Sequence, residues 1–206
     1  MSYELIAPDR AYRLGDIVEG FILGAADLDS PSIAPMDYQI RITRPRFAAV
    51  LTPCCSVGQK TLSLAPLVKV KPRFFDNAYF AADLARINRP MSPQQTVSEA
   101  LWNSLPEEEK QRRLGTSLDF ALVELYIYEP HDLLPPYPVT HQGSSISVQH
   151  YMIDFRSAHR VECKQVVKPN QVPLGAKVLQ LSRDSRGELR EKLANYFARI
   201  PSEDEV

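Results

Sequence analysis

Two apolar runs dominate the pattern of hydrophobic and polar positions along this chain. They cover residues 46–52 and 61–70 and consist mostly of apolar and β-branched residues. The Pro-Cys-Cys-Ser-Val-Gly stretch between them cannot continue either run as a strand. The pattern therefore predicts a central pair of strands joined by a polar turn that carries two cysteines.

Three further segments have the pattern of strands, with loops between them. Residues 12–23 contain a Gly-Asp turn and bulky apolar residues on both faces, and residues 38–43 alternate apolar and polar side chains. Residues 120–128 are almost continuously apolar, which is typical of a central strand. The small, polar and proline-interrupted residues 24–37 and the proline-rich residues 129–145 are predicted to be loops.

A hairpin is predicted near the end of the chain. Residues 147–155 and 159–167 read as its two strands, and a loop follows at residues 168–176. Alternation places Asp154 and Arg156 on one face of a strand. There they could form either a functional site or an ion pair at the surface.

Helical patterns appear in two parts of the chain. Residues 74–115 predict a helical insertion, with Ser92 as an N-cap before Pro93, Ser104 as a further candidate cap and Gly115 as a C-cap. A last helix is predicted from Ser182, as its N-cap, to about Arg199.

The last helix is predicted to be amphipathic. Leu189, Leu193 and Phe197 follow one another at four-residue steps and would form one apolar stripe. We expect this stripe to dock on the body of the protein that the strands form.

Composition limits the classes of function. The chain has 206 residues, 44% hydrophobic and 24% charged, and a formal net charge of −1. These values favour one globular domain. A net charge near zero does not attract nucleic acid to the surface as a whole, so a nucleic-acid site would be a local patch. There is no apolar run of membrane-spanning length and no signal-peptide core, so we expect a soluble, cytoplasmic protein without a membrane partner.

Three motifs carry a resemblance to a known family. They are GDIV at residues 15–18, RPRFAAVLT at residues 44–52 and LSLAPL at residues 62–67. In this order they resemble the first half of the MazF/PemK-like proteins, whose fold is a small SH3-like β-barrel. The Thr-Pro-Cys-Cys-Ser turn at residues 52–56 and the last helix also look like a little-characterised bacterial set with a Thr-x-x-Cys turn and a C-terminal amphipathic helix.

The resemblance implies a fold class and a domain plan. The chain is expected to be mainly β (β+α), an SH3-like β-barrel of the MazF/PemK type with a helical insertion and a C-terminal helix. A single domain would span residues 1–206. Its parts would be barrel strands at 12–73 and 118–178, the insertion at 74–115 and the helix at 182–199, which would dock on the barrel.

The resemblance also implies a chemistry. Toxin members of the group are endoribonucleases that need no metal, and Arg44 matches the arginine that stabilises phosphate charge. Arg46 is a second candidate. A threonine in the partner strand assists in the family, and Val68, which has no group to transfer a proton, stands at that position here.

Six cationic residues flank the two central strands. If these strands pair as a hairpin, the ends meet and make a local basic patch that holds phosphate. The alternative is a set of solvated charges at strand ends, which is common on protein surfaces. The six residues are Arg41, Arg44, Arg46, Lys69, Lys71 and Arg73.

The three cysteines leave several interpretations open. Cys54 and Cys55 could hold a nucleophile, a vicinal disulfide or half of a metal site, and Cys163 is the only distant partner. His159 and Cys163 lie four residues apart, whereas zinc needs four ligands. Buried structural thiols are the simpler interpretation, and no cofactor or metal is expected.

Three functions follow from these observations. The first is a toxin-like or phage-defence module that binds RNA or a protein partner, such as an antitoxin-like protein or a defence-system subunit. The second is a metal-independent endoribonuclease that uses Arg44 and Arg46. The third is a cysteine-dependent enzyme at Cys55. A homodimer is compatible with each.

Overall fold

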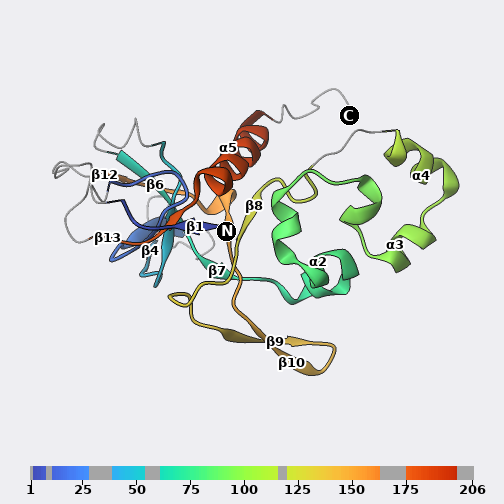
Figure 1. The fold of residues 1–206 in the computed structure, drawn as a ribbon, viewed down its shortest axis with the longest axis horizontal. Helices are drawn as coiled ribbons and strands as arrows, with labels where there is room; N and C mark the ends of the chain where they lie inside the picture. Colours follow the sequence, from blue (N-terminus) through green and yellow to red (C-terminus); the bar gives the residue numbers. More distant parts are fainter. Residues whose placement is uncertain are drawn as a thin grey trace. The chain divides into compact units, whose positions relative to one another are not determined.

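The structure is a computed structural model in which the chain forms two compact units. It describes residues 2–7, 11–27, 39–53, 61–115, 120–162 and 175–198. Residues 1–67 and 156–183 form the first unit, and residues 68–155 and 184–206 form the second. The chain is rich in antiparallel strands, as expected, and most of its helices are short (Figure 1). No described helix combines the length and the apolar composition needed to cross a membrane.

The first unit is built on a six-stranded antiparallel sheet. The order of the strands is β1-β13-β2-β5-β6-β12. A separate antiparallel hairpin belongs to the same unit and consists of β3 (Leu23–Asp27) and β4 (Gln39–Thr43). The strands of the sheet are β1 (Tyr3–Glu4), β2 (Ile17–Glu19), β5 (Ala48–Val50), β6 (Thr61–Pro66), β12 (His159–Glu162) and β13 (Ala176–Leu181).

The predicted central pair is present in this sheet. β5 pairs with β6, with Ala49 opposite Ala65, and its other edge pairs with β2. All three residues of β5 are buried, which explains why residues 47–51 are apolar without alternation. The core of the unit consists of Tyr12, Val18, Leu23, Ala48, Val50, Leu62 and Leu64.

Several predicted boundaries in the first unit are wrong. Residues 12–23 do not form one strand, because β2 stops at Glu19 and Gly20 follows with φ 91°. The predicted loop at residues 24–37 begins as strand, since β3 runs to Asp27. The predicted strand at residues 61–70 is divided into β6 and β7 (Val68–Lys69), which pairs with a different partner.

The second unit contains a small sheet and a hairpin. β11 (Tyr151–Asp154) pairs antiparallel with β7 on one edge and β8 (Leu125–Tyr128) on the other. The predicted loop at residues 129–145 contains β9 (Tyr137–His141), which pairs with β10 (Ser144–Val148). The turn between them has Gln142 at φ 48° and Gly143 at φ 79°, the backbone that two-residue hairpin turns favour.

The segment predicted to be a helical insertion contains a series of short helices. Ser92 is the N-cap of a 3₁₀ helix with Pro93 in its first turn, and Gly115 is the C-cap of α4, as predicted. Ser104 does not cap α4; its hydroxyl donates to the carbonyl of Leu101 at the end of α3. The helices are η1 (Pro72–Asp76), α2 (Ala78–Ala82), η2 (Leu84–Asn88), η3 (Pro93–Thr96), α3 (Glu99–Ser104) and α4 (Glu107–Leu114).

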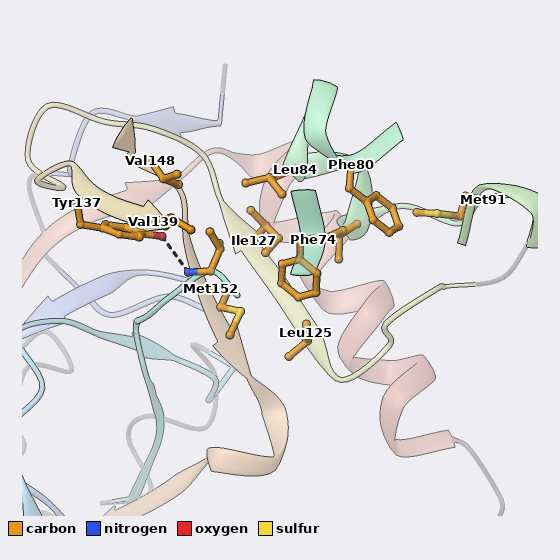
Figure 2. Close-up of a cluster of buried hydrophobic side chains, with 12 residues drawn as sticks. Phe74, Phe80, Leu84, Met91, Leu125, Ile127, Tyr137, Val139, Val148 and Met152 are labelled. Atoms are coloured by element: carbon orange, nitrogen blue, oxygen red, sulfur yellow. Dashed lines mark hydrogen bonds between the residues drawn. The ribbon is translucent and has the colours of Figure 1, made fainter. Parts of the chain in front are cut away.

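One hydrophobic core joins this insertion to the strands of the second unit (Figure 2). Phe74, Phe80 and Leu84 come from the helical segments, and they pack with Ile127 on β8 and Met152 on β11. The insertion is therefore part of a compact body with its own core, rather than an excursion from a barrel.

The predicted hairpin at residues 147–155 and 159–167 is wrong. β11 pairs within the second unit, whereas β12 pairs with β6 in the first. A 3₁₀ turn, η4 (Phe155–Ser157), follows β11 and interrupts the alternation that would place Asp154 and Arg156 on one face. The strands expected to close one barrel are thus divided between two sheets, and no pairing among the described residues closes either of them.

The last helix, α5 (Arg183–Ala198), begins directly after Ser182, as predicted. Leu189 is fully buried and Leu193 half-buried, but Phe197 is 72% exposed, so the predicted apolar stripe is only partly correct. Lys192 takes a buried position instead, one turn beyond Leu189.

Two hydrogen bonds of α5 lie within the second unit. The hydroxyl of Tyr126 on β8 donates to the carbonyl of Ser185 over 3.2 Å. The ammonium group of Lys192 donates to the carbonyl of Ile87 on η2. These bonds anchor the helix beside β8 and η2.

Candidate nucleic-acid interface

Arg44 and Arg46 lie directly before a buried central strand of the first unit. Both residues are exposed, and the guanidinium group of Arg46 is 5.1 Å from the centre of the Phe47 ring. The carbonyl of Phe47 accepts the N–H of Leu67 over 3.0 Å, which continues the β5–β6 pairing. The two arginines are therefore held at the end of a rigid pair of strands.

Arg41 is placed by a different element. It is exposed on β4, and its backbone partner on β3 is Ala25. The three predicted arginines of the first unit therefore come from the β4 strand and from the segment that connects it to β5.

The other three predicted cations belong to the second unit. Lys69 is exposed on β7, and its ammonium group lies 5.1 Å from the centre of the Tyr137 ring. Lys71 precedes η1, and the guanidinium group of Arg73 on η1 is 5.9 Å from the centre of the Phe74 ring. The six cations are therefore divided between the two units.

Tyr137 fixes the segment that carries these three cations. Its hydroxyl accepts the N–H of Val70 over 2.8 Å and donates to the carbonyl of His150. Burial raises the pKa of Tyr137 to about 12, so its hydroxyl is neutral near pH 7. The residue is a support for the backbone of Lys69 and Lys71.

A pocket adjoins Arg73. It has a volume of about 320 Å³ and is lined by Arg73, Asp76, Thr96 and Ser98 together with apolar side chains. Oδ1 of Asp76 lies 2.8 Å from Nε2 of His141, at the end of β9. The second unit thus pairs the imidazole of His141 with a carboxylate that lines the same pocket as the Arg73 guanidinium.

Sequence reasoning did not place any histidine near the cationic residues. Asp76 and His141 are 65 positions apart, and no spacing rule connects them. The one sequence signal for the position of His141 is the His-Gln-Gly-Ser segment at residues 141–144. Its Gln-Gly pair predicts a two-residue hairpin turn, which places His141 at the end of a strand.

Several cations elsewhere in the described chain are paired with carboxylates. Glu109 accepts from both Arg112 and Arg113, at 2.8 and 2.7 Å, and these bonds lower the pKa of Glu109. Arg89 lies 3.0 Å from Glu188, which raises the pKa of Arg89. Among the described residues, no carboxylate pairs with Arg44 or Arg46.

The hydroxyl groups on either side of the segment 44–51 have structural partners. Thr43 donates to the carbonyl of Leu23 over 3.4 Å. Thr52 accepts the N–H of Ser63 over 2.6 Å, which joins the ends of β5 and β6. Val68 lies on β7 and is 38% exposed.

The predicted cysteine site lies outside the described residues. This applies to Cys54, Cys55 and Cys163 alike. His159 is described on β12, where Nδ1 is 3.4 Å from the carbonyl oxygen of Gly24. The cysteine-dependent activity therefore remains a prediction.

Comparisons with protein-family models, with curated proteins and with solved structures found no match to this chain.

Proposed function

We propose that the protein is a cytoplasmic bacterial RNA-binding module of the toxin-like or defence-associated kind, with a small SH3-like barrel in its first unit. The order of motifs supports the barrel. Gly15 and Asp16 precede β2, Arg44 and Pro45 precede β5, and β6 ends in an Ala-Pro pair. The three strands are neighbours in the order β2-β5-β6.

One observation carries RNA binding. Arg44 and Arg46 are exposed at the end of a rigid strand pair, and no described carboxylate neutralises them. A guanidinium group in this state offers its donors to phosphate oxygens. A partner that supplies phosphates therefore gains more binding free energy at Arg44 and Arg46 than at Arg112, which is already paired with Glu109.

Salt dependence of RNA binding tests the proposal. A protein that neutralises phosphates on a single strand loses affinity with salt, with a slope of about −0.7 per contact in log K against log salt. Arg44→Ala and Arg46→Ala should each weaken binding of a short single-stranded RNA and reduce this slope. Arg112→Ala is the matched control, because it removes an equal charge from a side chain that is already paired with Glu109.

Either of two results would contradict RNA binding. One is the absence of RNA binding at low salt by a folded protein. The other is equal loss of affinity in Arg44→Ala and Arg112→Ala, which would show that only net charge matters. Specific capture of a protein partner that depends on Arg44, without RNA binding, would favour the protein-partner alternative.

A second function is favoured by the Asp76–His141 pair. Phosphodiester cleavage without metal needs a cation at the phosphate and a group that moves protons near neutral pH, and His is the usual residue for the second task. Arg73 and His141 supply both kinds of group within the second unit. Incubation of purified protein with RNA in EDTA, with His141→Ala as control, tests this endoribonuclease activity.

A further inference from the structure

A second pocket of the second unit lies among α2, η3 and α3. Its volume is about 440 Å³, within the range of about 300–1,000 Å³ that small-molecule sites occupy. The pocket combines aromatic rings, side-chain amides and one carboxylate. The side chains that carry this chemistry are Tyr79, Gln94, Gln95, Glu99, Trp102 and Asn103.

Hydrogen bonds hold the walls of this pocket in place. Nδ2 of Asn77 donates to the carbonyls of Gln95 at 2.9 Å and Val97 at 3.1 Å, and its Oδ1 accepts the N–H of Tyr79 at 2.9 Å. Oε1 of Gln95 accepts the N–H of Ser92 over 3.1 Å. Since Asn77 ties α2 to η3, the pocket is preorganised and a ligand does not have to order it.

Two aromatic side chains contribute to the lining. Trp102 on α3 is 8% exposed, and Tyr79 on α2 is half-buried. The guanidinium group of Arg86 lies 4.5 Å from the centre of the Tyr79 ring, and its Nη1 donates to the backbone carbonyl of Tyr79. Aromatic rings on a fixed wall are the surfaces on which proteins hold unstacked nucleobases.

The polar side chains of the pocket are open to a ligand. Within the described chain, no hydrogen bond or ion pair engages the side chains of Gln94, Glu99 or Asn103. The two amides offer both donors and acceptors, whereas an ionised Glu99 accepts only. A carboxylate fits a ligand edge that carries two adjacent N–H donors, and guanine has this edge in its ring and amino N–H groups.

We propose that this pocket binds a nucleobase of single-stranded RNA, with guanine preferred through Glu99. The inference rests on the proposed RNA binding and specifies which base the second unit recognises. Glu99 pairs with the N–H donors of guanine, and the ring of the base packs against Trp102. Adenine, cytosine and uracil place an acceptor in this part of their edge, so the carboxylate disfavours them.

Fluorescence of Trp102 tests the inference directly, because it is the only tryptophan in the chain. The full-length protein is titrated with GMP, AMP, CMP and UMP at constant ionic strength. Saturable quenching by GMP is expected, with the other nucleotides at least about tenfold weaker, since one good bidentate contact discriminates by roughly that factor.

Two variants separate recognition by Glu99 from its place in the first turn of α3. Glu99→Gln should lose most of the GMP preference, while its melting temperature stays close to that of the parent protein. Glu108→Gln is the control, since Glu108 is an exposed acid in the first turn of α4 and outside the pocket lining. Equal nucleotide affinities in the parent, or unchanged GMP preference in Glu99→Gln, would overturn the inference.

A guanine-containing RNA hexamer distinguishes this inference from the proposed function. If the hexamer binds through Arg44 while GMP does not quench Trp102, the pocket inference is wrong and RNA binding stands. If GMP quenches Trp102 but the hexamer does not bind, the pocket is a nucleotide site and the RNA proposal is wrong. Absence of both responses contradicts both.

Discussion

Asp16 and Lys177 form a buried ion pair between the start of β2 and the strand β13, with 2.7 Å between Oδ2 and Nζ. The side chains are 0% and 2% exposed. Oδ2 also accepts the N–H of Arg13 over 2.7 Å. Burial raises the pKa of Asp16 above its ordinary value, although the bond to Lys177 opposes this rise. The aspartate of the Gly-Asp motif thus has a structural role in the sheet.

Removal of one partner should destabilise the first unit strongly. Lys177→Met leaves Asp16 as an uncompensated buried charge, for which a cost on the order of 3–5 kcal/mol is typical. The double variant Asp16→Asn/Lys177→Met should cost less than the sum of the single changes, because neither buried charge remains. Chemical denaturation followed by circular dichroism measures these differences.

The control for this pair is Lys110→Met. Lys110 is 3.7 Å from Glu107, which is 74% exposed, so its loss should cost less than about 1 kcal/mol. A loss of similar size in Lys177→Met would show that the buried pair contributes no more than a surface pair.

The central strands and the helical insertion were predictable because local signals agree there. Parts of the apolar runs at residues 46–52 and 61–70 form the neighbouring strands β5 and β6, and Ser92 and Gly115 mark helix ends by the chemistry of their caps. Such signals act within a few residues. They do not show which strands share a sheet, so the chain was expected to form one barrel.

Pairings between distant residues could not be predicted in this way. β13 was missed although it pairs with both β1 and β2, because its partners are more than 150 positions away. For the same reason the Asp76–His141 pair beside Arg73 had no signature in the sequence. Lys192 was missed because a lysine on an apolar face breaks the pattern that predicts burial.

Two residues on α5 should differ sharply in their effect on stability. Leu189 is fully buried, and Leu189→Ala should cost about 2–5 kcal/mol because it removes packed methyl groups and leaves a cavity. Phe197 is 72% exposed, and Phe197→Ala should change stability by no more than about 0.5 kcal/mol. Thermal unfolding of both variants checks this order, and equal losses would mean that Phe197 packs against the body of the protein.

Removal of the last helix should unfold or aggregate the protein. Deletion of residues 182–206 takes away Leu189 and the bonds that α5 makes with β8 and η2. An unchanged melting temperature of the truncated chain would show that the second unit is stable without the helix. In that case the helix would serve another purpose than packing.

The Tyr137 hydroxyl should be required for the order of the segment that carries Lys69. Tyr137→Phe removes the acceptor of the Val70 N–H and the donor to the His150 carbonyl, both in a region of buried side chains. Loss of these two bonds should cost about 1–3 kcal/mol. Hydrogen exchange at the Val70 amide should become faster, and an unchanged exchange rate with unchanged stability would contradict this role.

The stability of the second unit should rise with pH above neutrality because of Lys192. Its side chain is fully buried, its ammonium group donates to the Ile87 carbonyl, and the Phe120 ring centre is 5.5 Å from Nζ. Burial lowers the pKa of Lys192 to about 7, although the charge of Glu124 opposes this. In the unfolded chain a lysine has its ordinary pKa of about 10.4.

The sign of the effect follows from proton counts. Between pH about 7 and about 10 the unfolded chain binds a proton at Lys192 that the folded chain does not bind. The free energy of unfolding therefore increases with pH, by up to about 1.4 kcal/mol per pH unit. Lys192→Met keeps the aliphatic stem and has no such proton. The parent should therefore gain stability relative to Lys192→Met from pH 7 to 9.5, a range that ends below the titration of tyrosine. Parallel curves for the two proteins would show that Lys192 keeps an ordinary pKa in the folded state.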